Sequence, residues 1–330
     1  MYTLASHLNP NLFGPDMESV PNRNGYGDGL KEAGERDQRI VALAADLTAS
    51  TKTDAFQKAF PNRFVQVGIA EQSMASVASG MAAMGKIPFI ASYAMFSPGR
   101  NWEQIRTTVA YNGSNVKIVG AHSGVSVGPD GATHQAIEDI ALMRVMPRMV
   151  VVAPCDYHEA KRTTLAFAQY QGPAYMRLAR EATPVITTPH SPFVIGKAER
   201  FMTRDKAHGK KVGIITTGTI AYQALTAGKL LNERGIGTSV LHMATIKPFD
   251  TEAVRAFAEE HDALVVVEEH QRMGGLGAAV AEYLSLVYPT RILRLGIDDQ
   301  FGQSGTPEEL LAHYGLDAAS IVKATEAFMA

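Results

Sequence analysis

The sequence predicts an α/β protein built from two doubly wound domains, each around a mostly parallel sheet. Short, continuously apolar runs recur along the chain, and stretches of helical character separate them. Continuous rather than alternating apolar strands are what a parallel sheet covered on both faces requires. A proline-rich segment interrupts the alternation near the middle of the chain, and the alternation then starts again.

The first domain is expected over residues 1–190. Its predicted strands are 39–46, 63–70, 86–93, 115–122 and 148–154, and its clearest predicted helices are 71–85, 101–113 and 156–170. Residues 184–192, "PVITTPHSP", contain three prolines without a helical period and are interpreted as a linker. The second domain, 191–330, is predicted to hold strands at 211–218, 238–246, 263–270 and 291–297 and a helix at 221–234.

Length and composition limit the possible functions. The 330 residues fit about two domains. A net charge of -2 without a long basic run argues against nucleic acid or an anionic membrane as a partner. The absence of a long apolar run predicts no membrane span. Residues 1–14 do not resemble a secretory signal, and the single Cys155 excludes an internal disulfide, so a cytoplasmic location is expected.

Glu71 stands out in "VGIAEQSMASVASGMAAMG" (67–85), where an apolar strand ends and a helix begins. A carboxylate in a first helical turn is favoured by the helix dipole, which is its ordinary role. Here the neighbouring side chains are too small and apolar to solvate it. Because ligands bind at the carboxyl ends of parallel strands, Glu71 is also a candidate for proton transfer.

A glycine-rich loop follows a later strand, in "AHSGVSVGPDGATHQAIEDIALMR" (121–144). His122 and His134 bracket Asp130 in this loop, on the sheet edge where Glu71 is expected. Histidines can donate and accept protons near neutral pH, and glycines let the backbone approach a ligand closely. Each histidine alone could be a surface residue, but the combination indicates a binding or catalytic site.

The pair of motifs "VGIAEQ" and "GPDGATHQ", about sixty residues apart, resembles the transketolase family of thiamine-diphosphate enzymes. The segment "DDQFGQSGTPEELLAHYGL" (298–316) also resembles this family. The resemblance covers almost the whole chain but only the second half of a full-length transketolase. It implies a pyrimidine-binding domain over 1–190 and a transketolase C-terminal domain over 191–330.

The resemblance implies a role for Glu71 and for two aromatic residues. The matching glutamate hydrogen-bonds a ring nitrogen of the cofactor's aminopyrimidine and so activates the cofactor as a nucleophile. Tyr93 and Phe96 match aromatics that pack against the pyrimidine ring, although such residues are otherwise ordinary core. Gly99 stands where a third aromatic often follows, so either the pocket is looser or a partner side chain fills it.

The resemblance also implies a substrate site. His122, Asp130 and His134 match positions that contact the hydroxyls and the carbonyl-derived oxygen of a sugar, with both histidines in catalytic roles. A second set matches positions that hold the substrate phosphate: Arg23, Ser50 and Arg180. Arginine suits phosphate because its planar fork makes two charge-assisted hydrogen bonds. The set therefore indicates a phosphorylated sugar rather than a 2-oxo acid.

The metal–diphosphate part of the family's site is not expected in this chain. The triplet Gly27–Asp28–Gly29 resembles the family's metal motif, but no apolar strand precedes it, and Asn62 lies in a loop-like setting. We interpret the triplet as a decoy and expect no metal ligands. The glycines of "RMGGLGAAVAEYL" (272–284) could bind an anion at a helix start or permit close helix–strand packing.

These observations predict the C-terminal subunit of a two-chain transketolase that moves a two-carbon ketol unit from a ketose phosphate to an aldose phosphate. An N-terminal partner subunit would bind the diphosphate of the cofactor with Mg²⁺ or Ca²⁺, in an α2β2 assembly, and the chain alone would be inactive. The alternatives are a β-type subunit of a 2-oxo acid dehydrogenase, a relative of deoxyxylulose-phosphate synthase, or a non-catalytic structural homologue. "GATHQ" and the phosphate set argue against a dehydrogenase subunit. The absence of a diphosphate domain argues against a deoxyxylulose-phosphate synthase relative. The presence of Glu71 and the histidines argues against a non-catalytic homologue.

Overall fold

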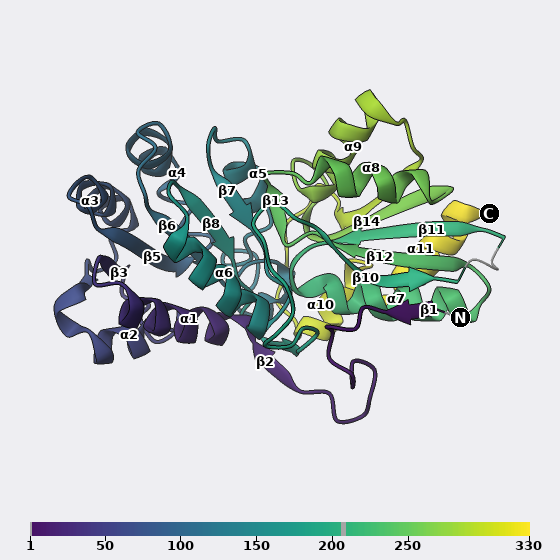
Figure 1. Cartoon of the computed structure of the whole chain (residues 1–330), viewed down its shortest axis with the longest axis horizontal. Coiled ribbons are helices and arrows are strands. Elements are labelled where there is room, and N and C mark those ends of the chain that lie inside the picture. The colour runs from purple at the N-terminus through teal and green to yellow at the C-terminus, as the bar shows by residue number, and fades with distance from the viewer. Residues whose placement is uncertain (1, 206–208) are drawn as a thin grey trace.

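The computed structural model describes residues 2–205 and 209–330 and has two mainly parallel sheets lying side by side (Figure 1). The α/β prediction is therefore confirmed. The first sheet has seven strands in the order β13-β7-β8-β6-β5-β3-β4. Their bounds are β3 Ile40–Ala44, β4 Phe64–Gln66, β5 Ile87–Tyr93, β6 Lys117–Ala121, β7 Val150–Val152, β8 Ala174–Arg177 and β13 Thr245–Lys247. All of its pairings are parallel except that of β13 with β7.

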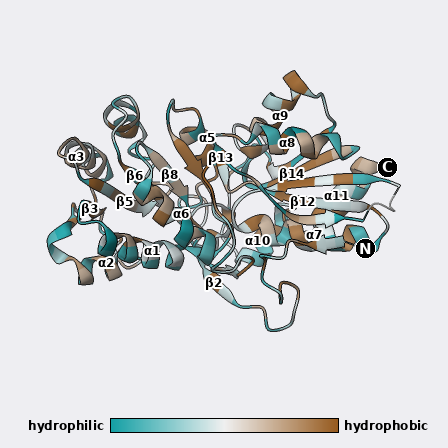
Figure 2. Ribbon diagram, viewed as in Figure 1, coloured by the Kyte–Doolittle hydropathy of each residue, from teal (hydrophilic) through white to brown (hydrophobic). Residues whose placement is uncertain are grey.

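Helices cover both faces of the first sheet (Figure 1). One face carries α3 (Glu71–Ala83), α4 (Trp102–Gln104), the π-helix η2 (Ile105–Ala110) and α5 (Asp139–Arg144). The other face carries α1 (Asn22–Arg36), α2 (Asp54–Ala59) and α6 (Tyr157–Gln169). Covering on both faces is the arrangement that continuously apolar strands require, and many of the brown, hydrophobic stretches of the ribbon in Figure 2 are strands.

The second sheet has six strands in the order β1-β10-β12-β11-β14-β15. Their bounds are β1 Tyr2–Leu4, β10 Glu199–Arg204, β11 Lys211–Thr216, β12 Gly237–His242, β14 Ala263–Gln271 and β15 Ile292–Ile297. One face packs on α8 (Thr251–Glu259) and α9 (Leu276–Val287), and the other on α7 (Ala221–Glu233) and α11 (Ala318–Met329). Shorter elements are β2 (Ser19–Pro21), β9 (Ala182–Pro184), α10 (Pro307–His313) and the 3₁₀ turns η1 (Pro61–Arg63), η3 (Val125–Asp130) and η4 (Gly218–Ile220).

Each half of the chain contributes a strand to the sheet of the other half, and the two sheets have buried side chains in one common core cluster. β1 lies at the edge of the second sheet, and β13 lies at the edge of the first. One cluster of buried side chains joins Val151 and Tyr175 of the first sheet to Ile215 and Leu241 of the second. The family-derived domain boundary near residue 190 remains a prediction. Two strand pairs cross it, β1 with β10 and β13 with β7.

The structure corrects two local expectations and adds two elements. The run 238–246 is not one strand: β12 ends at His242, and the chain then changes sheet to form β13. The strand β8 and the helix α1 were not predicted. The helix predicted at 101–113 ends at Ala110 and is mostly a π-helix.

The glycine-rich segment of α1 is a packing surface. A Cβ on Gly25 would lie 2.0 Å from the carbonyl oxygen of Tyr157, so glycine lets α1 press against α6. The triplet Gly27–Asp28–Gly29 lies inside the same helix, and Asp28 accepts a 2.6 Å hydrogen bond from the Tyr157 hydroxyl. The triplet therefore serves helix packing.

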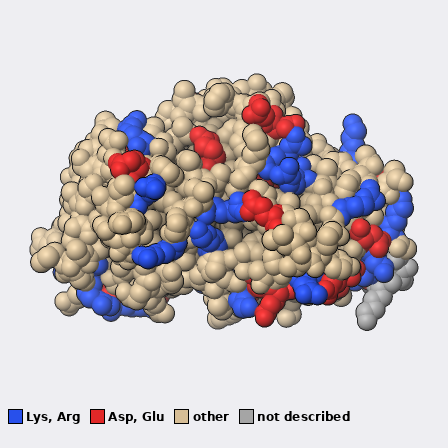
Figure 3. All heavy atoms as spheres, turned by 90° about the horizontal axis from the view of Figure 1, so that it is seen from above, with Lys and Arg blue, Asp and Glu red and all other residues tan. Residues whose placement is uncertain are grey.

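None of the described helices is long and apolar enough to cross a membrane. On the face shown in Figure 3, acidic and basic side chains lie in small groups separated by uncharged surface.

Candidate active site

Glu71 is the first residue of α3 and is 1 % exposed. Its Oε2 accepts a 2.7 Å hydrogen bond from Nη1 of Arg100, and its main-chain oxygen accepts one of 3.0 Å from Nδ2 of Asn101. The carboxylate is thus buried, as its sequence context suggests, but it has a cationic partner. Sequence reasoning missed Arg100 because nothing in "SPGRNWEQ" indicates which carboxylate the arginine will meet.

Two aromatic rings follow the end of β5. Tyr93 is the last residue of that strand, and Phe96 lies in the turn after it, with 6.0 Å between their ring centroids and 20° between their planes. The guanidinium of Arg100 lies 4.7 Å from the Phe96 centroid, so one arginine contacts both Glu71 and this aromatic pair. A Cβ on Gly99 would lie 2.0 Å from the main-chain oxygen of Met95, which excludes a third aromatic on this backbone.

His122 directly follows β6, the strand next to β5, and its imidazole stacks on Tyr93 with a centroid distance of 3.8 Å. Burial, reinforced by the charges of Arg23, Arg180 and His134, lowers the pKa of His122 to about 3. The ring is therefore neutral at physiological pH. Nη1 of Arg23 lies 3.5 Å from its Nε2. Since arginine can only donate, Nε2 is the acceptor and the proton sits on Nδ1, which is buried without a hydrogen-bond partner among the described residues.

Arg23 and Ser50 meet at the same place. Nη1 of Arg23, on α1, donates a 2.7 Å hydrogen bond to the main-chain oxygen of Ser50. Burial lowers the pKa of Arg23, but an arginine stays charged at neutral pH. A fixed positive charge therefore faces His122 from the α1 side.

His134, Asp130 and Arg180 border the glycine-rich loop. The His134 ring meets Phe96 edge to face at 5.6 Å, and its Nδ1 lies 2.9 Å from the Thr133 hydroxyl. Nη1 of Arg180 donates a 2.7 Å hydrogen bond to the main-chain oxygen of Val127 and lies 3.4 Å from Oδ1 of Asp130. Two acceptors of the glycine-rich loop thus fix the position of the Arg180 guanidinium.

The structure brings the predicted site residues together. A chain of direct contacts runs through Glu71, Arg100, Phe96, Tyr93, His122, Arg23 and Ser50. His134 contacts the rings of Tyr93 and Phe96 in this chain. Arg180 and Asp130 form a separate pair, and the charge of Arg180 helps to lower the pKa of His122.

Comparison with known proteins decides the family. A family model described as the transketolase pyrimidine binding domain matches residues 18–185, and one described as the transketolase C-terminal domain matches 202–321. A protein of Methanocaldococcus jannaschii named for a transketolase C-terminal section is 46 % identical over 91 % of this chain and 94 % of its own length. The chain belongs to the transketolase family.

Other relatives agree with that family. One of the subunits of an apulose-4-phosphate transketolase from Phocaeicola vulgatus is 39 % identical, over 93 % of this chain and 97 % of its own length. A solved structure described as a split gene transketolase, inactive beta4 tetramer, superimposes with a TM-score of 0.85 at 40 % identity, covering 94 % of this chain and 99 % of that one. The chain is thus similar in extent to separately encoded transketolase subunits.

The residues present suit one end of the transketolase cofactor. An aminopyrimidine needs a carboxylate partner for a ring nitrogen and apolar or aromatic walls, and the chain supplies Glu71 and the pair Tyr93 and Phe96, which Arg100 joins. In a transketolase site the unpartnered Nδ1–H of His122 also offers a donor that no described side chain uses.

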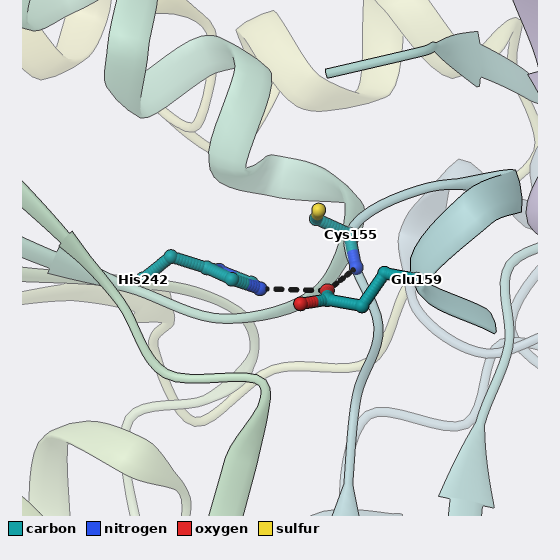
Figure 4. Close-up of side chains that lie close together, drawn as sticks. All are labelled: Cys155, Glu159 and His242. Atoms are coloured by element: carbon teal, nitrogen blue, oxygen red, sulfur yellow. Dashed lines mark hydrogen bonds and ion pairs between the residues drawn. The ribbon is translucent and has the colours of Figure 1, made fainter. Parts of the chain in front are cut away.

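The described residues offer no comparable set for a metal and diphosphate. In 2–205 and 209–330, one group of three potential metal-ligating side chains lies close together: Cys155, Glu159 and His242 (Figure 4). All three are buried, and Oε2 of Glu159 already accepts hydrogen bonds from His242 Nε2 (2.8 Å) and from the main-chain N–H of Cys155 (2.7 Å). Its hydrogen bonds connect α6, which covers the first sheet, to β12 of the second sheet.

The helix start in "RMGGLGAAVAEYL" also has an internal partner. Both oxygens of the buried Glu268 accept main-chain hydrogen bonds at the N-terminus of α9, from Leu276 (2.7 Å) and Gly277 (2.8 Å). This carboxylate takes the place of an external anion. Close packing, the second of the two expectations for this segment, is the one that the contacts favour.

Glu269 is a further residue that sequence reasoning missed. This buried carboxylate of β14 accepts a 2.6 Å hydrogen bond from the main-chain N–H of Ser126 in the glycine-rich loop. Gly124, with φ +82°, lies so close that a Cβ there would be 2.2 Å from the Glu269 carboxylate. The second domain therefore helps to shape the loop that carries the candidate substrate residues.

Proposed function

We propose that this chain is the C-terminal subunit of a two-chain, thiamine-diphosphate-dependent transketolase that transfers a two-carbon ketol unit from a ketose phosphate to an aldose phosphate. The observation that carries the proposal is the buried Glu71 carboxylate, which Arg100 links to the ring cluster of Tyr93, Phe96 and His122 at the carboxyl edge of the first sheet. The similarity to a separately encoded subunit of an apulose-4-phosphate transketolase supports it.

Thiamine diphosphate, when bound, supplies the nucleophilic carbon that carries the two-carbon unit. Glu71 would hold its aminopyrimidine by a hydrogen bond to a ring nitrogen and share a proton there. Tyr93 and Phe96 would provide the walls that fix the plane of that ring and exclude water from it. Burial of Glu71 suits this role because a hydrogen bond in a water-excluded site is stronger and better oriented than one in solvent.

His122 is placed to handle the oxygen atoms of the substrate. As a neutral imidazole with its proton on Nδ1, it can donate one hydrogen bond without adding a charge. His134 and Asp130 would complete the recognition of sugar hydroxyls. Because His122 stacks on Tyr93, substrate and cofactor contacts would be mechanically linked.

The phosphate of the substrate would lie between Arg23 and Arg180. Both guanidinium groups exert their charge on His122, which places them near one point. The main-chain acceptors that hold them are Ser50 and Val127. Each guanidinium keeps further N–H groups with which to bind an anion.

A partner subunit would bind the diphosphate together with Mg²⁺ or Ca²⁺, in an α2β2 assembly. The chain supplies a carboxylate and aromatic walls for the pyrimidine, and the one group of three potential metal ligands among its described residues, Cys155, Glu159 and His242, includes none of them. Each active site would then lie between two different chains, and the isolated chain would be inactive.

The test is a substitution in the reconstituted complex. Glu71→Gln keeps the shape but removes the ionisable carboxylate, so ketol transfer should fall by at least about 100-fold. Glu103→Gln, an exposed glutamate on α4, is the matched control and should leave the rate unchanged. Unchanged turnover in the Glu71→Gln complex would reject the proposed role.

A further inference from the structure

Arg100 contacts both features that a pyrimidine ring would need. Its Nη1 donates to Oε2 of Glu71 at 2.7 Å, and its guanidinium lies 4.7 Å from the centre of the Phe96 ring. A guanidinium group is flat, carries N–H donors and stacks on aromatic rings. An aminopyrimidine ring has the same three properties: it is flat, it carries N–H donors, and it stacks on aromatic rings.

We propose that Arg100 is an internal placeholder: in the unassembled chain its guanidinium occupies the pyrimidine position and pairs with Glu71, and it must rotate away when the cofactor binds. This inference rests on the proposed function, because it assumes that Glu71 is the pyrimidine partner. It assigns Arg100 a positioning role that acts through Glu71.

The burial of the two partners suits such a replacement. Glu71 is 1 % exposed, so without a partner it would be a buried, uncompensated charge. The Arg100 side chain is 47 % exposed, so solvent reaches the arginine side of the pair and weakens the contact. The contact is strong enough to satisfy the carboxylate and weak enough to be displaced.

The surrounding backbone does not depend on the placeholder. Asn101 donates hydrogen bonds from Nδ2 to the main-chain oxygen of Glu71 (3.0 Å) and to the hydroxyl of Ser97 (3.2 Å). These contacts tie the turn after β5 to the start of α3 without using the Arg100 side chain. Rotation of the Arg100 side chain would therefore uncover the Glu71 carboxylate while the main chain of Glu71 stays in place.

The first arm of the test uses the isolated chain and measures its melting temperature. Arg100→Gln should lower it by a few degrees, because Glu71 loses its cation. Arg106→Gln, the same change at an exposed arginine on the neighbouring η2, should not. The double variant Glu71→Gln/Arg100→Gln should recover most of the loss, because no buried charge is left unpaired. An Arg100→Gln chain as stable as the wild type would overturn the proposal.

The second arm measures the binding of thiamine diphosphate, with Mg²⁺ present, to the reconstituted complex by calorimetry. Without an internal occupant to displace, the Arg100→Gln complex should bind the cofactor about two- to fivefold more tightly than the wild-type complex. Equal or weaker binding would overturn the proposal and make Arg100 neutral or a cofactor ligand. If the wild-type complex binds no cofactor at all, the proposed function itself fails, which is a different outcome.

Discussion

The imidazole of His122 lies flat on the ring of Tyr93, with 3.8 Å between the ring centroids and 24° between the planes. The two residues lie at the ends of adjacent parallel strands, since Tyr93 ends β5 and pairs with Ala121, the residue before His122. The stack buries the imidazole beside Arg23, and both burial and the arginine charge oppose its protonation.

His122 should make the chain sensitive to acid. Its folded-state pKa of about 3 lies below the ordinary 6.5, so below pH 6.5 the unfolded chain binds a proton that the folded chain does not. The free energy of unfolding should therefore fall by about 1.4 kcal/mol per pH unit from this group as the pH drops from 6.5 to about 4. Urea unfolding of the isolated chain should show a shallower pH dependence for His122→Asn. The same change at the exposed His190 should leave it unaltered, and an unaltered slope for His122→Asn would contradict this account.

Arg180 should determine the affinity for the phosphate of the substrate. In the reconstituted enzyme, Arg180→Ala should raise the KM for a phosphorylated sugar about 10- to 100-fold, the range expected for lost hydrogen bonds to a charged group. The KM for the unphosphorylated sugar should change much less, and Arg180→Lys should recover part of the loss. Arg39→Ala, at an exposed arginine paired with Asp37, is the control. An equal effect on both sugars would argue that Arg180 does not bind phosphate.

Gly99 should not tolerate a side chain. Its Cβ would lie 2.0 Å from the main-chain oxygen of Met95, so Gly99→Ala should lower the free energy of unfolding by about 1–3 kcal/mol or more. Gly80→Ala on α3 is the comparison, because its Cβ would meet nothing within 4 Å and alanine favours a helix. Denaturant unfolding of the isolated chain measures both, and equal stabilities would show that the turn rearranges.

The pair of Glu159 and His242 should hold the two sheets together. Removing one partner of a buried hydrogen bond leaves the other unsatisfied, so Glu159→Ala should cost about 1–3 kcal/mol of unfolding free energy. Glu259→Ala breaks an exposed pair with Arg255 and should cost at most about 1 kcal/mol. Similar effects of the two substitutions in urea titrations would mean that the buried pair contributes little.

Much of the fold could be predicted because each long parallel strand is a continuous apolar run. β8 was not predicted because its apolar run is broken by Arg177, whose charge is satisfied by the buried Asp139. α1 was not predicted because its sequence contains several glycines, which are unfavourable in helices. In the structure, Gly25 lets α1 contact α6 closely. The change of sheet after His242 depends on pairing with β7, which no local pattern encodes.

The residues of the candidate site could be predicted where a polar or aromatic side chain lies at or after the end of a predicted strand, as for Glu71, Tyr93 and His122. Arg100 and Glu269 were not, for different reasons. Arg100 meets Glu71 only through the turn after β5, and Glu269 meets Ser126 across 143 residues of chain. Such contacts arise from tertiary packing, which residue type and spacing alone do not specify.

The central claim is that this chain supplies one half of an active site, and an assay of ketol transfer with separated subunits tests it most directly. The chain, a partner carrying the metal–diphosphate motif, and their mixture are each supplied with thiamine diphosphate, Mg²⁺ and a pair of sugar phosphates. We predict no transfer by either chain alone and transfer by the mixture, rising to a plateau at one partner per chain. Full transfer by the isolated chain would contradict the claim.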